Sequence, residues 1–351
     1  MKIGNNNIGL SYQPFIVAEM SGNHNQSLER ALEIVEAAAS SGAHALKLQT
    51  YTADTITLDL KDSEFVIKDK NSLWKDRSLY ELYQEAYTPW EWQGPIIKRS
   101  NELGMLCFST PFDETAVDFL EDLNVPAYKI ASFENIHLPL VEKVASTGKP
   151  MIISSGMASI SELGELVQTI RDAGCNNFAL LKCTSTYPAS PENSNILSIP
   201  HMRELFQCEV GLSDHTMGVG AAVAGVAHGA TIIEKHFTLS RADGGVDSAF
   251  SMEPEEMNQL VIETNHAWKA LGKVTYGPTK VEKKSLIFRR SLYIAADMKA
   301  GEILTKKNLR IVRPGLGLPP KYYKKLLGMK VVKNVKKGNP ISWDLIKTRK
   351  D

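Results

Sequence analysis

Short apolar runs alternate with longer amphipathic segments over residues 1–272. The runs predict eight strands, over residues 15–20, 43–50, 105–111, 127–132, 151–156, 178–184, 209–214 and 231–237. Apolar residues spaced three or four apart predict helices between them, as in 27–42, 114–123, 138–147 and 159–174. Eight such alternations over about 250 residues favour an α/β fold of the (β/α)8 TIM-barrel type. An open doubly wound sheet usually has fewer strands and a glycine-rich phosphate turn, and no GxGxxG follows the first strand.

The pattern changes after residue 272. Residues 273–285, KVTYGPTKVEKKS, combine Gly, Pro and clustered Lys, which predicts a linker. The segments SLYIAAD, RIVRP and KVVKNV then predict short strands, separated by the turn sequences KAGE and KKGNP. We therefore expect a barrel domain over 1–272, a linker over 273–285 and a small, mostly β domain over 286–351.

Charge is distributed unevenly, although the chain has 40 basic and 40 acidic residues. Residues 286–351 contain 17 Lys and Arg against 4 Asp and Glu, so they carry +13 and the preceding part carries −13. A basic segment of this kind can bind nucleic acid. Here it lacks the aromatic platforms and recognition motifs of nucleic-acid-binding modules. We therefore expect no nucleic-acid partner and favour docking on an acidic surface of this chain or of a second copy.

Neither membrane insertion nor disulfide bonding is expected. No apolar run reaches the roughly 18 residues that span a bilayer, and the start MKIGNNNIGL lacks the basic region and apolar core of a signal peptide. We therefore expect no membrane partner and a cytoplasmic location. The four cysteines, Cys107, Cys175, Cys183 and Cys208, form no CxxC pair, and we expect them to be buried thiols.

Every predicted strand finishes in polar residues, at the end where a barrel of this type carries its active site. These residues are Glu19, Lys47 with Gln49, Ser109 with Thr110, Lys129 with Ser132 and Glu134, Ser154 with Ser155, Lys182 with Thr184, Asp214 with His215, and Glu234 with His236. A single Ser or Asp at such a place often only caps the next helix. The complete set predicts a polar active site at the mouth of the barrel.

Two histidines in this set suggest a metal ion. His215 and His236 end consecutive strands, so they would be neighbours able to hold a divalent ion whose other positions stay open to water and substrate. Two hydrogen-bonded structural histidines are the alternative. Glu234 shares a strand face with His236 and would orient the site or bind the ion through water.

Two lysines suggest an anionic ligand. Lys47 and Lys129 lie at the ends of the second and fourth predicted strands and form a second cluster with the hydroxyl groups of Thr110, Ser132, Ser154 and Ser155. One lysine at a strand end would also suit a Schiff base. Two lysines among hydroxyls favour the binding of phosphate or carboxylate.

The segments SGNHNQSLE, KLQTY, CFSTPF, PAYKIAS, ISSGM, LLKCTSTYP, EVGLSDHT and IEKHF, in this order, resemble the sialic acid synthase family, which condenses phosphoenolpyruvate with an amino sugar. The resemblance extends along essentially the whole chain, and the basic C-terminal module is similar to the antifreeze-like (SAF) domain of that family. Residues 72–92, 182–188, 290–293 and 312–323 resemble the pseudaminate-forming branch more than the N-acetylneuraminate-forming branch. A legionaminate-forming member would use the same mechanism.

The resemblance implies a role for each candidate site residue. Phosphoenolpyruvate would be bound by Lys47, Lys129, Ser132, Ser154 and Ser213, and a divalent ion, Mn²⁺ or in its place Mg²⁺ or Co²⁺, by His215 and His236. Further substrate contacts are implied for Gln49, Thr110, Ser185, Tyr187 and Asp247. The catalytic candidates are Glu19, Glu134 and Lys129. Ser185 stands where sialic acid synthases carry Asn, a departure that affects one of these contacts.

The resemblance also implies a domain-swapped homodimer. In the family, the small domain of one chain covers the barrel mouth of its partner, and Arg313 would then reach the neighbour's substrate. The acidic barrel and the basic module are consistent with such docking. Lys235 has no implied role, and we expect it to pair with an acidic helix residue.

Two other classes of function stay open. A metal-dependent barrel aldolase or sugar isomerase would also use two histidines and carboxylates, but it has little use for two lysines among hydroxyls. A binding role of the C-terminal module, in ice or polysaccharide recognition, would rest on similarity of fold alone. The dense lysines of this module argue against ice binding.

Overall fold

The computed structural model of the protein describes residues 1–69 and 72–346. The chain forms two compact units, Met1–Gly272 and Lys273–Asp351. Residues 273–285, the expected linker, are part of the second unit. That they form a separate linker remains a prediction. The expected end of the small domain, residues 347–351, lies outside the described residues. Within the described ranges, no helix is long and apolar enough to cross a membrane.

The first unit contains a closed barrel of eight parallel strands within the part of the chain that the structure describes, in the order β10-β3-β4-β5-β6-β7-β8-β9. The strands are Phe15–Glu19 (β3), Ala45–Thr50 (β4), Leu106–Pro111 (β5), Tyr128–Ile130 (β6), Met151–Ser154 (β7), Phe178–Cys183 (β8), Glu209–Ser213 (β9) and Ile232–His236 (β10). The barrel closes by pairing of β10 with β3, in which His236 lies opposite Glu19. On the other side of β3, Glu19 lies opposite Lys47 of β4. The predicted TIM barrel is confirmed.

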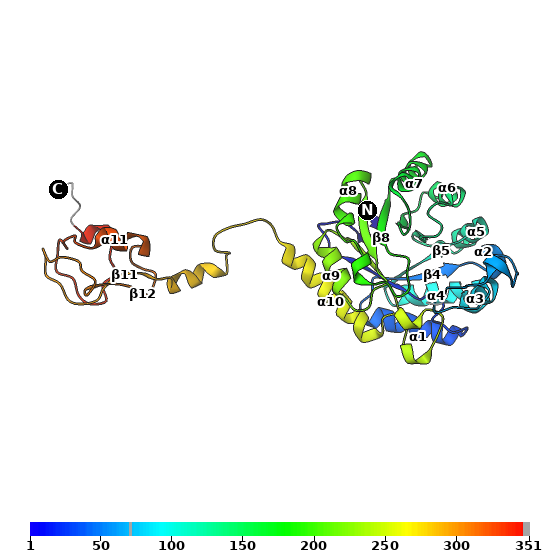
Figure 1. The fold of residues 1–351 in the computed structure, drawn as a ribbon, viewed down its shortest axis with the longest axis horizontal. Coiled ribbons are helices and arrows are strands. Elements are labelled where there is room, and N and C mark those ends of the chain that lie inside the picture. The colour runs from blue at the N-terminus through cyan, green and yellow to red at the C-terminus, as the bar shows by residue number, and fades with distance from the viewer. Residues whose placement is uncertain (70–71, 347–351) are drawn as a thin grey trace. The chain divides into compact units, whose positions relative to one another are not determined.

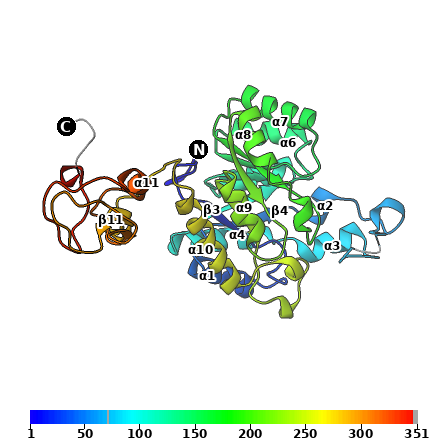
Figure 2. The ribbon, with the colours of Figure 1, turned by 60° about the vertical axis from the view of Figure 1, so that its left-hand side comes forward.

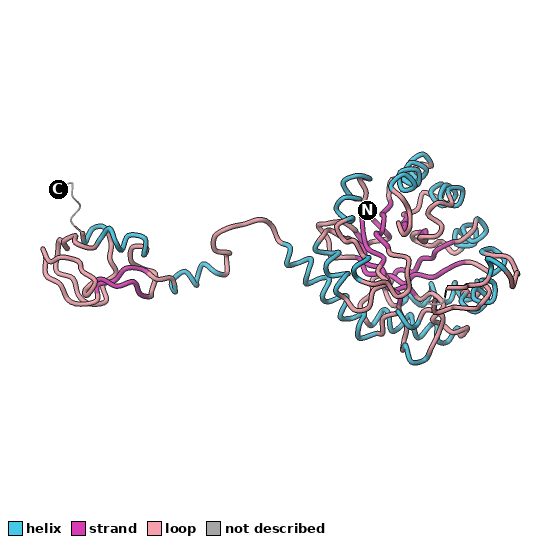
Figure 3. The backbone as a smooth tube through the Cα atoms, viewed as in Figure 1, coloured by secondary structure: helices cyan, strands magenta, loops and turns pink. Residues whose placement is uncertain are grey.

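Helices surround these strands, as Figures 1 and 3 show. They are α1 (Leu28–Ser40), α4 (Trp90–Glu102), α5 (Glu114–Asp122), α6 (Leu138–Ser146), α7 (Ile160–Asp172), α8 (Ser198–Phe206), α9 (Gly220–Ala227) and α10 (Pro254–Leu271). The side chains of Ser27, Asp113 and Ser159 accept backbone N–H groups at the starts of α1, α5 and α7. These caps satisfy donors that the helices themselves leave unpaired.

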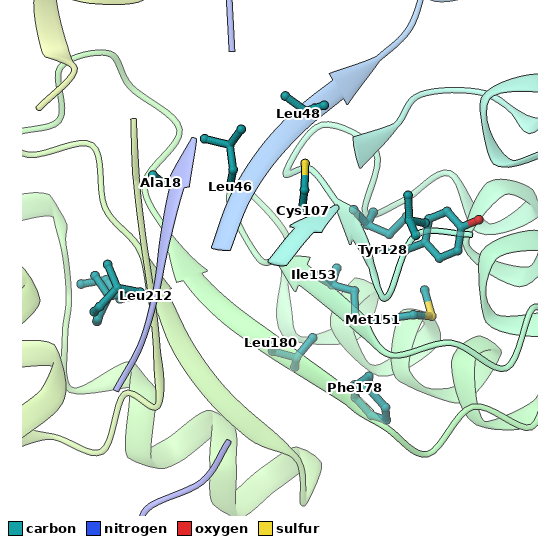
Figure 4. Packing of buried hydrophobic residues seen from close by; sticks show 14 of the residues in the cluster. Ala18, Leu46, Leu48, Cys107, Tyr128, Met151, Ile153, Phe178, Leu180 and Leu212 are labelled. Carbon is teal, nitrogen blue, oxygen red and sulfur yellow. The ribbon is translucent and has the colours of Figure 1, made fainter. Parts of the chain in front are cut away.

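Strand residues alternate between an outer and an inner apolar cluster. Leu46 and Leu180 point away from the barrel axis and belong to the outer cluster between strands and helices (Figure 4). Val17 and Ile232 belong to the inner cluster, because successive side chains of a strand point to opposite faces. The barrel is thus filled with apolar side chains over part of its length.

A hairpin at the N-terminus adds to the inner cluster. Its strands are Lys2–Ile3 (β1) and Asn6–Asn7 (β2), which pair antiparallel. Ile3 and the following Ile8 are fully buried in the inner cluster. The hairpin therefore packs against the interior of the barrel.

Residues 51–89 form an excursion between β4 and α4. It contains α2 (Ala53–Ile56), η1 (Ser63–Phe65) and α3 (Leu79–Ala86). Figure 2 shows the chain between α2 and α3 extending beyond the ring of helices. Shorter 3₁₀ helices follow β8 and β10, over Pro191–Asn193 (η2), Arg241–Asp243 (η3) and Ser248–Phe250 (η4).

The second unit is built around a small antiparallel sheet. Its elements are η5 (Glu282–Phe288), β11 (Ser291–Ile294), β12 (Leu309–Val312), η6 (Pro320–Tyr322), α11 (Tyr323–Leu326) and η7 (Trp343–Leu345). A separate apolar cluster, including Leu292, Leu309 and Ile341, forms its core. The third predicted strand, KVVKNV, is wrong. Residues 330–335 instead form isolated bridges to three different segments, so no continuous ladder develops.

Gly211 lies in β9 at a place where no side chain fits. A Cβ atom there would lie closer than 3.0 Å to the carbonyl oxygen of Ile232 and to the side chain of Leu181. Because these neighbours are packed in the barrel interior, we expect Gly211→Ala to lower the free energy of unfolding by about 1–3 kcal/mol. Urea unfolding followed by tryptophan fluorescence measures this change.

The matched control is Gly164→Ala in α7, where an added Cβ would meet nothing within 4 Å. Alanine is the better helix residue, so this change should be neutral or stabilising by about 0.5–1 kcal/mol. Equal urea midpoints for Gly211→Ala and the unsubstituted protein would contradict the packing described for β9.

Candidate active site

The inner face of the strands changes from apolar to polar towards their C-terminal ends. On β10 the inward series runs Ile232, Glu234, His236, and on β4 it runs Ala45, Lys47, Gln49. The polar ends surround a cavity of about 640 Å³. The cavity therefore lies at the end of the barrel where the sequence predicts the active site.

Most candidate site residues line this cavity. They are Lys47, Gln49, Lys129, Ser132, Glu134, Ser154, Ser185, Tyr187, Ser213, His215, His236 and Asp247. Glu19 and Thr110 are buried and are not among the lining residues. Arg313 belongs to the second unit.

Lys47 is held by a group of polar neighbours. Its Nζ forms an ion pair with Glu19 Oε2 and donates a hydrogen bond to Thr110 Oγ1 over 3.3 Å. Gln49 Nε2 donates to the other Glu19 oxygen, Oε1, over 3.0 Å. Glu19 and Thr110 thus lie behind the cavity wall and fix the direction of Lys47 and Gln49.

Lys129 and Glu234 form the adjoining part of the floor. Lys129 Nζ donates to Ser154 Oγ over 2.7 Å and lies 3.6 Å from Glu234 Oε1. Ser213 Oγ donates to the same Glu234 oxygen over 3.1 Å, and Lys47 Nζ lies 4.0 Å from it. The sequence prediction made Glu234 a partner of His236. In the structure this carboxylate contacts the two lysines and Ser213.

Burial sets the ionisation of these groups. It raises the pKa of Glu19 to about 7 despite the nearby Lys47. For Glu234 burial acts in the same direction, but Lys129 and Lys47 outweigh it and lower the pKa. Burial also lowers the pKa of Lys129, although Glu234 opposes this shift. A ligand that brings negative charge would stabilise the two ammonium groups.

Glu134 lies in the cavity without a strong partner. Its Oε2 is buried and has no hydrogen-bond partner within the described residues. Burial raises the pKa of Glu134 to about 7, against the charges of Lys129 and Lys47. A carboxyl group with such a pKa can both donate and accept a proton near neutral pH.

The two histidines are neighbours, as the sequence predicts, with ring centroids 5.3 Å apart. His215 Nδ1 lies 2.9 Å from the carbonyl oxygen of Thr184, so Nδ1 carries a proton and, in the neutral ring, Nε2 keeps a lone pair. Burial holds the pKa of His236 well below its usual range, so this imidazole is neutral. Its Nδ1 is buried, has no hydrogen-bond partner in the described chain and lies 3.8 Å from Asp247 Oδ2.

These two imidazoles suit a divalent metal ion. Neutral imidazole is a common metal ligand, and a hydrogen bond from the second ring nitrogen to a carbonyl, as in His215, is typical of ligating histidines. Across residues 1–69 and 72–346, no group of three or more His, Cys, Asp and Glu side chains is arranged to hold an ion. Water or substrate would therefore have to supply the other ligands of an ion bound here.

Lys235 stabilises the loop that carries His215. Its side chain is 1% exposed, and Nζ donates to Asp214 Oδ2 over 3.0 Å and to the carbonyl oxygens of Thr216 and Gly218. The prediction that Lys235 pairs with an acidic helix residue is therefore wrong, because its partner Asp214 lies directly before His215. Lys235 faces away from the barrel interior and ties together the residues on both sides of this histidine.

An aromatic group flanks the histidines. The Tyr187 ring lies 4.5 Å from that of His215 and 5.2 Å from that of Phe250. Trp74 of the excursion lies 6.0 Å from Tyr187 and donates from Nε1 to the Val246 carbonyl. These rings therefore form an aromatic part of the site next to the two histidines.

Sequence reasoning missed several lining residues. Ser21, Tyr51, Trp74, Tyr83 and Phe112 also line the cavity. Ser21 Oγ donates to Asp247 Oδ2, and its place two residues after Glu19, just beyond the end of β3, was a usable signal. Tyr51 and Phe112 directly follow β4 and β5, so they too were within reach of this reasoning. Trp74 and Tyr83 gave no such signal, because they follow no strand end. Cys183 is buried as predicted, but it also lines the cavity.

Known proteins and protein families match this chain over nearly its whole length. The family model described as the NeuB family matches residues 34–276, and the SAF domain model matches residues 289–347. Pseudaminic acid synthase of Campylobacter jejuni is 42% identical over 341 residues, covering 97% of this chain and 98% of the relative. Pseudaminic acid synthase of Helicobacter pylori is 43% identical over 333 residues, covering 94% and 97%.

A solved structure supports the same assignment. The N-acetylneuraminic acid (sialic acid) synthetase of Leptospira borgpetersenii, crystallised with citrate, superposes with a TM-score of 0.71 at 31% identity. The match covers 82% of this chain and 94% of that one. Both the sequence and the fold of the barrel lead to the same assignment, and the chain belongs to the NeuB family.

Proposed function

We propose that this protein condenses phosphoenolpyruvate with 2,4-diacetamido-2,4,6-trideoxy-altrose and water, giving pseudaminic acid and phosphate. One observation carries the proposal: two buried lysines with serine hydroxyls lie beside a pair of histidines in a single cavity. Three relatives with 42–43% identity are pseudaminic acid synthases. Legionaminic acid synthases and the human N-acetylneuraminate-9-phosphate synthase share less of the sequence.

The anionic substrate would bind on the polar floor. Lys47 and Lys129 offer two ammonium groups, and Ser132, Ser154 and Ser213 offer hydroxyl donors at the same end of the barrel. A phosphate and a carboxylate together need several donors and positive charge, which this set provides. A barrel aldolase that acts on a neutral sugar has no comparable need for two buried lysines.

His215 and His236 would hold a divalent ion, with Mn²⁺ as our choice and Mg²⁺ or Co²⁺ as substitutes. When bound, such an ion supplies Lewis-acid polarisation of the sugar aldehyde. Lys235 keeps His215 in place through its contacts with Asp214 and Thr216. Asp247 and Tyr187, next to the histidines, would contact the sugar.

Glu134 is suited to carry the proton through the reaction. Carbon 3 of phosphoenolpyruvate bonds to the aldehyde carbon while protonated Glu134 gives its proton to the aldehyde oxygen. The resulting carboxylate then takes a proton from the water that adds at carbon 2. The carbon–oxygen bond to phosphate breaks as the new hydroxyl becomes the ketone, and its proton leaves with the phosphate. Glu19 would position Lys47 and Gln49 without touching substrate.

We further propose a domain-swapped homodimer in which Arg313 of one chain completes the site of the other. The opposite net charges of residues 1–285 and 286–351 support this arrangement. We also assign the reaction to the cytoplasm. Recovery of the protein in an extracytoplasmic cell fraction would contradict that location.

The test of the function is phosphate release from phosphoenolpyruvate by the purified full chain with Mn²⁺. We expect release with 2,4-diacetamido-2,4,6-trideoxy-altrose, little with N-acetylmannosamine, and loss of release after treatment with a chelator. Restored release on adding back Mn²⁺ excludes damage by the chelator. Release with N-acetylmannosamine alone would move the protein to another branch, and chelator-resistant release would contradict the metal.

The pKa of Glu134 predicts the pH dependence. Because its raised pKa is about 7, the protonated form needed for the first step is lost as pH rises through 7. We expect kcat/KM for the sugar to fall about tenfold per pH unit above that value. Glu134→Gln should lower kcat by about 10²- to 10⁴-fold and abolish this limb of the profile.

The control for this profile is Glu33→Gln, which changes an exposed carboxylate on α1. It should keep both the rate and the limb. An unchanged limb in Glu134→Gln would assign the titration to another group and remove Glu134 from the proton path.

The proposed dimer predicts complementation. In the proposed dimer each active site combines Glu134 of one chain with Arg313 of the other. Arg313→Ala and Glu134→Gln should therefore each be nearly inactive alone, since each removes one residue from both sites. In a mixture that exchanges subunits, a heterodimer holds one site with both residues intact, so up to about one quarter of the normal activity should return. No recovery in mixtures shown to contain heterodimers would mean that Arg313 acts in its own chain.

A further inference from the structure

One face of α3 forms part of the cavity wall. Leu79, Leu82, Tyr83 and Ala86 all line the cavity, and their spacing of three, one and three residues places them on one side of a helix. Three of the four side chains are aliphatic. An amphipathic helix of a barrel normally turns such a face towards the protein core.

This face is not part of the barrel core. Leu82 is 6% exposed and Ala86 is 8% exposed, yet neither belongs to the outer or the inner apolar cluster of the described barrel unit. Ile56 and Ile67, also from the excursion, line the same cavity. The α3 face and these two isoleucines therefore supply an apolar wall, while the strands supply a polar floor; Asp69 and Ser72 of the excursion line the cavity as well.

Aromatic rings connect this wall with the strands. The Tyr51 ring contacts those of Tyr83 and Phe112 edge-on, with centroids 5.7 Å and 5.0 Å away. Tyr51 directly follows β4, which carries Lys47, and Phe112 directly follows β5. The apolar wall is thus continuous with the strand ends next to the floor.

The wall is fixed to the loop after β3. Gln26 Nε2 donates to the carbonyl oxygens of Glu85, over 2.9 Å, and Tyr87, over 2.8 Å. A Cβ atom at Gly22 would lie 3.1 Å from the Ala86 carbonyl oxygen and 3.2 Å from its Cα, so a larger residue there would push the backbone of α3 by a few tenths of an ångström. These contacts hold the C-terminal end of α3 in place before any ligand binds.

We propose that the α3 face selects sugars that carry a methyl group at carbon 6 over hexosamines with a hydroxyl there. The inference rests on the proposed function, in which the second substrate is a 6-deoxy sugar with two acetamido groups. Phosphoenolpyruvate has no methyl group to place on an aliphatic wall, whereas this sugar has three. A carbon-6 hydroxyl buried against Leu82 would lose its hydrogen bonds to water without replacement.

The size of the effect follows from the chemistry of such walls. An apolar pocket rejects an added hydroxyl group by about 100-fold at most, because no polar group of the site is left unpaired. We therefore expect the unsubstituted protein to prefer the 6-deoxy sugar by about 10- to 100-fold in kcat/KM. Leu82→Asn introduces a hydrogen-bonding side chain and should reduce this preference by tenfold or more.

The experiment measures phosphate release by the full chain with 2,4-diacetamido-2,4,6-trideoxy-altrose and with its 6-hydroxy counterpart, 2,4-diacetamido-2,4-dideoxy-altrose. Leu82→Asn should lose kcat/KM for the first sugar and lose less, or gain, for the second. The KM for phosphoenolpyruvate should stay unchanged, because the polar floor is untouched. Leu79→Asn, at a less buried position of the same face, should shift the preference in the same direction and serves if Leu82→Asn does not fold.

The matched control is Leu58→Asn, an exposed leucine of the same excursion that is absent from the cavity lining. It should leave the preference between the two sugars unchanged. Equal losses for both sugars in Leu82→Asn and Leu79→Asn would overturn the selection by the α3 face while leaving the proposed function intact. If the unsubstituted protein releases no phosphate with the 6-deoxy sugar, the proposed function itself fails.

Discussion

The burial of two lysines and two glutamates in one layer of the barrel is the constraint on which the site depends. Isolated charges in such a place would cost several kcal/mol each, so every group in the layer needs a partner. Glu19 pairs with Lys47, and Glu234 lies between Lys47, Lys129 and Ser213. Together they keep the two ammonium groups charged, close and directed towards the cavity, which a substrate with two anionic groups requires.

The barrel accommodates this layer because of the two-residue period of its strands. Each inward series begins with a residue of the inner apolar cluster, such as Ile232 or Ala45, and ends in a polar one. The outward residues between them pack against the helices and are apolar almost throughout. Stability and chemistry are thereby assigned to alternating positions of the same strands. Lys235 fits this division, since it lies on the outward face and acts on the loop around His215 rather than on the cavity.

Much of this arrangement could be predicted from the sequence. Buried parallel strands give continuous apolar runs, and polar residues at their ends stand out, so the lysines, serines and histidines were found at the correct end of the barrel. Contacts between distant segments could not be predicted in the same way. The partner of Lys235 follows from the path of the loop after β9, and the contact of Glu234 with the lysines follows from the curvature of the barrel. The helix α3 was missed because its apolar face turns to a cavity, where burial depends on the surrounding fold rather than on a core.

The fixed attachment of α3 to the loop after β3 also bears on how this architecture diversifies. The donors and charges of the floor come from strand ends, whereas the apolar wall comes from the excursion between β4 and α4. Substitutions in the excursion leave the hydrogen-bonded layer of the strands intact, provided that Gly22 and Gln26 keep their contacts with the excursion. The residues of the excursion can therefore change during evolution while the lysines, glutamates and histidines at the strand ends stay the same. New sugar acids can arise in this way on an unchanged condensation chemistry.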